Sequence, residues 1–318
     1  MAFVMEAYEA GIITKDHTGG KELKFGAGLE VLNCLHEMAA GIGFGVELGQ
    51  GIRRLKEKWV KELNADAAFL HDIGMEVKGL EFSEYVSKES LAQQAGYSLA
   101  VKGPQHDEAW LIFMDMVNNQ IPTFEDKAEA LYYFPLFRTW FGLLGLCKIL
   151  WNDIAPADNK KYPPQQAAKI PEHVENYWKF FEGMTGIRLD EEKMLNQSAR
   201  VHTLQRIMCY MLGYGTREHD IPPMRAIGPV TEEEYESRRE RYDKHIKEDI
   251  GVDPGGISIK EKLKLIRDYR FKQYDLVIDA AYKRRGWNKN GVPTVTRLKE
   301  LGIDLPILVD IIKNENES

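Results

Sequence analysis

Residues 28–39 read GLEVLNCLHEMA, and this stretch shows the pattern that decides the fold class. Val31, Cys34, Leu35 and Met38 recur at spacings of three and four, and polar residues fall largely between them. That spacing places the apolar residues on one face of an α-helix. The same spacing recurs along most of the chain and strict alternation is rare, so the sequence predicts a mainly α protein.

The rest of the chain divides into further helical stretches and loops. Helices are expected at residues 44–63, 125–148, 172–183, 190–212 and 260–285, with exposed amphipathic helices in the charged run 231–249. Pro135, Gly142 and Gly145 are expected to interrupt the second of these stretches, and Asp190 is expected to cap the fourth. A linker or surface loop is expected at residues 155–171, which hold four prolines, and another loop at 213–229.

Composition excludes several classes of protein. Of 318 residues, 42 are Lys or Arg and 49 are Asp or Glu, and the net charge of -7 has the wrong sign for an electrostatic nucleic-acid binder. No stretch approaches the roughly 20 apolar residues of a membrane-spanning helix, and the first ten residues lack the basic start of a secretory signal. Three distant cysteines without a CxxC pair argue against a disulfide framework. We therefore expect a cytoplasmic protein of ordinary globular composition.

One loop histidine is the most suggestive local group. His106 follows Gly103 and Pro104 directly and stands beside Asp107 and Glu108. A loop of this kind can hold an imidazole toward a cavity, with a carboxylate nearby to fix its tautomer. From the spacing alone, a solvated loop histidine is the favoured interpretation.

One cysteine stands in a glycine-rich setting. Cys147 ends the segment GLLGLC at residues 142–147, where two glycines allow another group to approach the backbone closely. The positive charge of the neighbouring Lys148 favours the thiolate form of the cysteine. A thiolate there would suit a soft metal. From the residues alone, a buried small apolar side chain is the favoured interpretation, and more strongly so for Cys34 and Cys209, which lie in helical stripes.

Six segments in order resemble one known family. They are GIITKDHTGG at 11–20, ELKFG at 22–26, VKGLE at 77–81, GLC at 145–147, RRGWNKNGVPT at 284–294 and LKELGI at 298–303. Together they resemble the tungsten-containing aldehyde ferredoxin oxidoreductase family. The order and spacing agree over nearly the whole chain.

The resemblance implies the helical C-terminal domains of that family. Residues 1–76 correspond to the remainder of its second domain and residues 77–318 to its third. It implies a tungsten (or molybdenum) bispyranopterin near a 4Fe-4S cluster, with aldehydes oxidised to carboxylates and electrons passed to ferredoxin. The family's pterin-binding domain and its first three cluster cysteines lie upstream of Met1. A complementary N-terminal chain or domain is therefore expected, and this chain alone is not expected to hold a cluster.

The resemblance also assigns roles to individual residues. Cys147 matches the cysteine that supplies the fourth cluster ligand from a DxxGLC motif, and the backbone of Gly145, Leu146 and Lys148 is expected to lie against a pterin. Gly142 replaces the aspartate of that motif. His106 matches a histidine near the metal, where it is expected to donate a hydrogen bond or move a proton. Its two acidic neighbours are possible orienters.

Three alternatives stay open. Because Gly142 departs from the aspartate of the family motif, a related reductase of aromatic acyl-CoA thioesters, of the benzoyl-CoA type, remains an alternative to the aldehyde oxidoreductase. A remnant that keeps the helical scaffold and binds no metal is a rival from another class. For ferredoxin, the basic groups at 238–241 and 283–285 are candidate docking points, although a solvated helix face is the favoured interpretation. The sequence leaves open whether the chain forms a homo-oligomer, which substrate the enzyme acts on, and whether the metal is tungsten or molybdenum.

Overall fold

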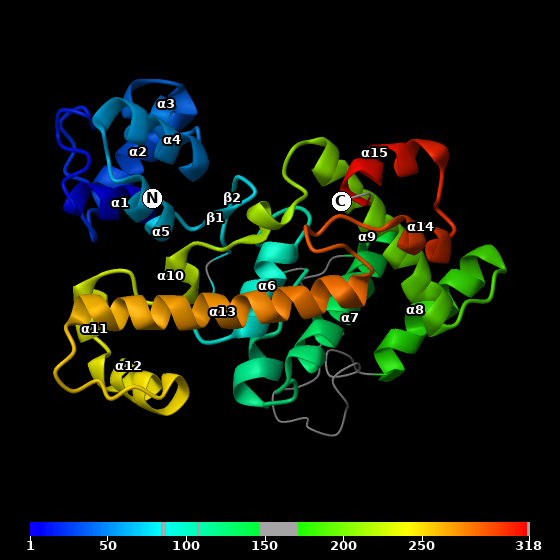
Figure 1. Cartoon of the computed structure of the whole chain (residues 1–318). Helices are drawn as coiled ribbons and strands as arrows, with labels where there is room; N and C mark the ends of the chain where they lie inside the picture. The colour runs from blue at the N-terminus through cyan, green and yellow to red at the C-terminus, as the bar shows by residue number, and fades with distance from the viewer. Residues whose placement is uncertain (84, 86, 107, 147–170, 317–318) are drawn as a thin grey trace. The chain divides into compact units, whose positions relative to one another are not determined.

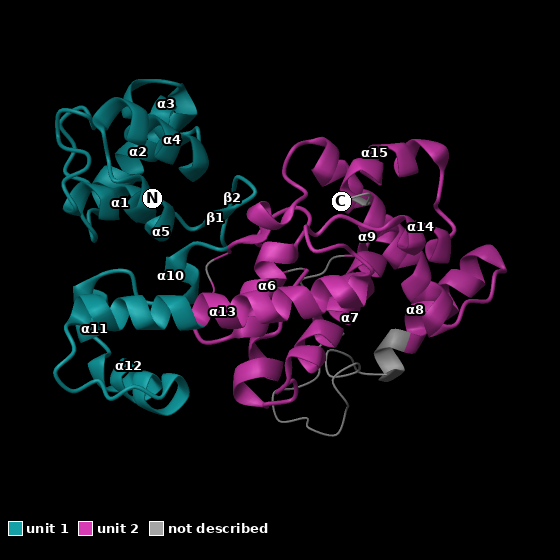
Figure 2. Cartoon of the chain, viewed as in Figure 1, with its two compact units in different colours: residues 1–82, 222–269 teal, residues 83–221, 270–318 magenta. Residues whose placement is uncertain are grey.

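The computed structural model describes residues 1–318 apart from 84, 86, 107, 147–170 and 317–318 (Figure 1). The predicted fold class is confirmed, because α-helices dominate the described residues and a single two-stranded hairpin is the sheet found there. The chain forms two compact units (Figure 2). Unit 1 comprises Met1–Phe82 and Pro222–Tyr269, and unit 2 comprises Ser83–Ile221 and Arg270–Ser318. The division into family domains at residue 77 stays a prediction.

Unit 1 is built from short helices around an aromatic and aliphatic core. Its elements are α1 (Ala2–Glu9), α2 (Gly28–Ala40), α3 (Gly43–Leu48), α4 (Ile52–Leu63), α5 (Ala67–Ile73), β1 (Glu76–Val77), β2 (Leu80–Glu81), α10 (Met224–Ile227), α11 (Glu232–Glu236), α12 (Arg239–His245) and the π-helical turn η5 (Ile246–Ile250). Phe3 stacks on Trp59 with ring centroids 5.4 Å apart, and Leu55 and Leu70 are buried in the same cluster. This packing joins α1, α4 and α5.

The motif VKGLE forms the one hairpin of the described chain. Val77 pairs with Leu80 across an antiparallel register. Lys78 and Gly79 connect them with φ values of 58° and 82°. Two successive positive φ angles are typical of the turn that suits two-residue hairpins.

The prediction of a single helix at residues 44–63 is wrong. Two helices, α3 and α4, occupy the stretch, and the chain breaks at Gly51, whose φ of 81° and ψ of 165° lie in a region that only glycine adopts readily. The carboxylate of Glu81 accepts a hydrogen bond from the backbone N–H of Ile52 at 3.1 Å, which satisfies one donor at the new helix start. The apolar spacing is helical on both sides of the break and does not reveal it.

We expect Gly51→Ala to lower the free energy of unfolding by about 1–3 kcal/mol, because the added Cβ is strained at this φ and ψ. Gly49→Ala is the matched control, since Gly49 has the right-handed helical φ of -62° and ψ of -11°. Urea unfolding of both variants measures the difference. Equal stability of the two would contradict the role assigned to Gly51.

The apolar stripe of α2 is only partly buried. The helix forms as predicted, and Cys34 has no exposed surface. Leu35 and Met38 on the same predicted face are 50% and 38% exposed. On this face only Cys34 is part of the buried core of unit 1. The apolar spacing therefore predicts the helix but not how much of its apolar face is buried.

Unit 2 contains the longer helices. Its elements are α6 (Leu91–Leu99), the π-helical turn η1 (Phe113–Val117), α7 (Phe124–Leu143), α8 (Pro171–Thr185), α9 (Glu191–Met211), the 3-10 turn η4 (Arg217–Asp220), α14 (Val295–Leu301) and α15 (Pro306–Asn316). Helix α13 (Ile259–Arg285) carries the boundary between the units at Tyr269. The main core cluster of unit 2 includes Leu131, Phe134 and Ile278, which come from α7 and α13.

Pro135 does not interrupt α7, contrary to the prediction. The helix continues to Leu143, and Pro135 is buried within it. Proline lacks the N–H that would bind the carbonyl four residues earlier. That carbonyl, of Leu131, instead accepts a hydrogen bond from Arg285 Nη2 at 2.9 Å. A side chain from a distant helix thus satisfies the group that the proline leaves open.

Other helix ends follow local sequence signals. Asp190 caps α9 as predicted, because its carboxylate accepts from the backbone N–H of Lys193 at 2.9 Å, and this hydrogen bond lowers the pKa of Asp190. Pro171 occupies the first position of α8, where its missing N–H is tolerated. The linker predicted at 155–171 otherwise lies outside the described residues.

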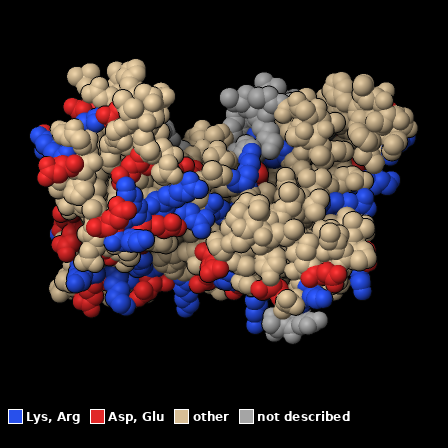
Figure 3. Space-filling view, turned by 90° about the horizontal axis from the view of Figure 1, so that it is seen from above, with Lys and Arg blue, Asp and Glu red and all other residues tan. Residues whose placement is uncertain are grey.

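The charged run at 231–249 folds into short helices that have one buried side. Tyr235 and Tyr242 are buried and stacked with ring centroids 5.3 Å apart. Lys262 donates to Asp243 at 2.7 Å. On the face shown in Figure 3, positive and negative side chains lie interspersed. Among the helices that the structure describes, none has both the length and the apolar character that a membrane span requires.

Candidate functional site

His106 lies in the loop between α6 and η1, in unit 2. Gly103, with a φ of 110°, turns the chain just before it. The imidazole is half-buried, and its Nδ1 lies 2.6 Å from the hydroxyl oxygen of Ser83. The backbone N–H of Ser83 donates to the carbonyl of Pro104 at 3.0 Å, so two segments 23 residues apart hold the ring. Such a hydrogen bond at Nδ1 fixes the ring orientation.

Helix α6 fixes the far end of this loop. Gln93 is fully buried, and its amide donates to the carbonyl of Ala109 at 2.6 Å and accepts from the N–H of Leu111 at 2.7 Å. Glu108 is also buried, and its carboxylate accepts from the N–H of Val101 at 3.3 Å. The loop therefore holds His106 between anchored segments rather than as a freely solvated side chain.

Gly96 allows α6 and the loop to approach closely. A Cβ at this position would lie 2.4 Å from the Cβ of Ala109. We expect Gly96→Ala to lower the free energy of unfolding by about 1–3 kcal/mol, although alanine is the better helix former. Gly142→Ala is the matched control, because its Cβ would meet nothing within 4 Å. A Gly96→Ala variant as stable as the control would contradict this close packing.

Aromatic rings flank His106 on the described surface. Tyr85 meets the imidazole edge-on at 5.1 Å between centroids, and Trp110 lies 5.9 Å from it. The ring centroids of Tyr85 and Trp110 are 4.3 Å apart, and the ring of Phe113 continues the row with its centroid 6.2 Å from that of Trp110. Tyr85 and Phe113 are 40% and 38% exposed. The histidine is thus bordered by flat apolar surfaces that suit an apolar or aromatic molecule.

The other predicted site residues are only partly visible. Cys147, Lys148 and Asp107 lie outside the described residues. Gly145 and Leu146 form an exposed turn after α7, in which Gly145 has a φ of 70° and open space around its Cβ position. Their roles stay predictions.

The two described cysteines are core residues. Cys34 and Cys209 are both buried, and the thiol of Cys209 donates to the carbonyl of Val101 at 3.2 Å. Burial raises the pKa of Cys34, which disfavours a thiolate. Within the described part of the chain, no group of three or more His, Cys, Asp or Glu side chains is arranged to hold a metal ion.

The basic groups considered for ferredoxin docking are partly engaged. Arg239 pairs with Glu236, and Arg284 pairs with Glu129, with Nη2 and Oε1 2.9 Å apart. Arg285 is 5% exposed and is therefore not a surface group. The expectation that the run at 283–285 presents three surface cations is wrong for its last residue.

A buried ionic network in unit 2 was not expected from the sequence. The guanidinium of Arg206 donates to both carboxylate oxygens of Asp220, at 2.9 and 2.6 Å, and neither side chain is more than 1% exposed. Tyr282 donates to the same carboxylate at 2.5 Å, and Tyr274 donates to the Asp220 carbonyl. Residues far apart in sequence thus share one carboxylate.

Comparisons with known proteins identify the family. The family model for aldehyde ferredoxin oxidoreductase, domains 2 and 3, matches residues 1–303. The chain belongs to the aldehyde ferredoxin oxidoreductase family. No curated protein matches it.

A solved structure has a similar fold. It is described as the active site complex BamBC of benzoyl coenzyme A reductase in complex with 1,5-dienoyl-CoA, and it matches with a TM-score of 0.57 and 18% sequence identity. The match covers 99% of this chain and 44% of that chain, so this oxidoreductase-family chain spans less than half of the neighbour's length.

Proposed function

We propose that this chain is the C-terminal part of a tungstopterin oxidoreductase that oxidises an aldehyde to a carboxylate and passes electrons through an iron–sulfur cluster to ferredoxin. The observation that carries the proposal is the anchored position of His106 in a chain of this family. The imidazole is held by Ser83 and bordered by aromatic rings, which suits a proton-transfer group beside a substrate.

The turn after α7 is the described segment that would meet the cofactor. Leu143 and Leu146 are 46% and 42% exposed, and the Cβ positions of Gly142 and Gly145 are open, so a flat ring system has room against this turn. The N–H groups of Gly145 and Leu146 bind the carbonyls of Gly142 and Phe141, so the turn offers a surface rather than hydrogen-bond donors. We assign Cys147, the next residue, to the cluster.

A tungsten (or molybdenum) bispyranopterin, when bound, supplies the two-electron chemistry. The role of this chain is to position the substrate and to move protons. Oxidation of an aldehyde with water yields a carboxylate, two electrons and three protons, and His106 takes up one of these protons. We assign the transfer to Nε2, because Nδ1 is engaged by Ser83.

Reduction of an aromatic acyl-CoA thioester is the second candidate function. The row of Tyr85, Trp110 and Phe113 beside His106 favours it, since stacked or edge-on contacts suit an aromatic ring. The fold neighbour described as a benzoyl coenzyme A reductase complex adds support. In this direction the ring accepts two electrons and two protons, and His106 supplies one of the protons.

Metal content separates both enzymes from a metal-free scaffold. The protein is isolated anaerobically from its native source with any complementary N-terminal chain, and elemental mass spectrometry measures tungsten, molybdenum and iron. We expect about one tungsten or molybdenum, and about four iron atoms from the cluster to which Cys147 belongs. Cys147→Ser is expected to lower iron, whereas Cys209→Ser, at a buried core thiol, is expected to retain it. Absence of metal from the complete complex would refute the enzyme proposal.

Turnover assays separate the two enzymes. The complex is given aliphatic aldehydes with oxidised ferredoxin, or benzoyl-CoA with a low-potential reductant. Carboxylate formation from the aldehydes supports the first proposal. Formation of a dienoyl-CoA product without aldehyde turnover would replace it with the second.

A further inference from the structure

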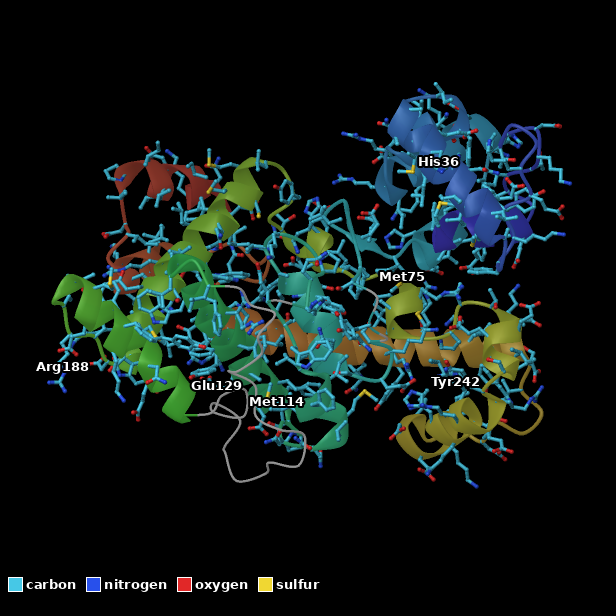
Figure 4. All side chains as sticks on the ribbon, turned by 180° about the vertical axis from the view of Figure 1, so that it is seen from behind. His36, Met75, Met114, Glu129, Arg188 and Tyr242 are labelled. Atoms are coloured by element: carbon cyan, nitrogen blue, oxygen red, sulfur yellow. The ribbon has the colours of Figure 1, made fainter. Side chains whose placement is uncertain are left out.

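Helix α2 of unit 1 presents an exposed face without Lys, Arg, Asp or Glu. Leu29 and Leu32 are 79% and 48% exposed. With about 3.6 residues per turn, the same side of the helix holds further exposed residues, which are small, apolar or uncharged. His36, labelled in Figure 4, lies in the middle of them. We call this set the α2 face: Gly28, Leu29, Leu32, Asn33, Leu35, His36, Ala39 and Ala40.

The opposite side of α2 is already used within unit 1. Cys34 is buried in the core, and Glu37 pairs with Lys21 at 2.5 Å and accepts from the backbone N–H of Gly45 at 3.1 Å. A helix at a protein surface usually turns charged residues to the side away from the core. Helix α2 is instead apolar on both sides, which is typical of a helix that is buried all round. The α2 face is therefore expected to be covered in the assembled protein.

Apolar side chains in the adjoining segments extend this surface. Phe25 precedes α2, Ile42 follows it and Val46 lies in α3, and each is about half exposed. Together with the leucines of the α2 face they offer apolar surface on the order of several hundred Å², a size at which exposed patches mark interaction sites. With a polar rim around it, this approaches the roughly 800 Å² that each partner of a stable dimer buries.

The α2 face is suited to a second copy of itself. Two copies carry the same net charge of -7, so they repel each other least across a surface without charged side chains. Large residues lie toward one end of the face and small ones toward the other. If two α2 helices cross antiparallel about a two-fold axis at position 34, Leu29 of each copy meets Ala39 of the other, and Leu32 meets His36. Large side chains then pack on small ones, and the helix dipoles oppose each other.

We propose that this chain forms a two-fold homodimer through the α2 face, with the two α2 helices antiparallel. The contact covers the leucines that unit 1 leaves exposed. The proposal is independent of the proposed function.

Sedimentation velocity of the full chain over a range of concentrations tests the proposal. We expect the mass of a dimer at micromolar concentration. Leu32→Glu places a carboxylate in the middle of the contact on both copies, so it is expected to raise the Kd of the dimer about 100-fold or more. Leu276→Glu is the matched control, because Leu276 is a 41% exposed leucine on α13, outside the α2 face. It should dimerise as the wild type does.

Disulfide crosslinking tests the antiparallel arrangement. Leu29→Cys and Ala39→Cys should crosslink efficiently when the two variants are mixed under mild oxidation, and much less when each is oxidised alone. A parallel pairing would instead crosslink Leu29→Cys with itself.

Three results would overturn the proposal. The first is a monomeric wild-type chain at all concentrations, and the second is a dimer that Leu32→Glu leaves intact. The third is a chain that stays monomeric but binds the complementary N-terminal chain and loses that binding in Leu32→Glu, which would assign the α2 face to that partner.

Discussion

Replacing His106 by alanine in the complete enzyme is expected to lower kcat by about 10²- to 10⁴-fold, the usual contribution of a positioned acid or base. Substrate binding should change less, because the aromatic surface of Tyr85, Trp110 and Phe113 remains. Steady-state kinetics with the better of the two substrates measures the change. The pH profile of the variant should lose the limb that belongs to the imidazole.

Two further variants separate proton transfer from positioning. Ser83→Ala removes the partner of Nδ1 and is expected to lower kcat less than His106→Ala while shifting the pH profile. His36→Ala changes an exposed histidine on α2, labelled in Figure 4, and is expected to leave kcat unchanged. If His106→Ala retained wild-type kcat and an unchanged pH profile, the role assigned to His106 would be wrong.

Asp220→Ala is expected to lower the free energy of unfolding of the chain by about 3–5 kcal/mol, because it leaves the guanidinium of Arg206 buried without its carboxylate. The penalty is severe here for two reasons. Arg285 adds a second positive charge beside the same Trp287 ring. Tyr282 also loses the acceptor of its hydroxyl group. Urea unfolding followed by tryptophan fluorescence measures the effect.

Asp275→Ala is the matched control for that loss. Asp275 pairs with Arg217 at 2.9 Å, but its side chain is 63% exposed, and such pairs contribute about 0–1 kcal/mol. We expect the double variant Arg206→Met, Asp220→Leu to lose less free energy of unfolding than Arg206→Met alone, because the double change removes both charges. A loss below about 1 kcal/mol for Asp220→Ala would show that the pair is dispensable.

The sequence predicted those features that depend on neighbours within a few residues. The apolar spacing gave the helical class, and it gave α8, α9 and α13 nearly to their ends. Asp190 was identified as a cap because capping is a contact with the next turn. The break at Gly51 was missed, because the apolar spacing is helical on both sides and gives no sign of the φ that this glycine adopts.

The candidate site was predicted in part. His106 was selected from its place after Gly103 and Pro104 and from the resemblance to the family. Its hydrogen-bond partner was not found, because Ser83 lies 23 residues away and a single serine is no signal by itself. The only hint of the aromatic row was the presence of Trp110 and Phe113 shortly after the histidine.

The sequence by itself determined the helical class, several helix ends and membership of the family, because short-range spacing and ordered motifs carry these properties. Only the tertiary structure decided which charges are buried. Arg285 stands in a run of three basic residues that reads as a solvated helix end, yet it is enclosed beside Trp287 and the Leu131 carbonyl that Pro135 leaves open. Burial of a cation depends on groups brought from distant helices, and no local pattern records them.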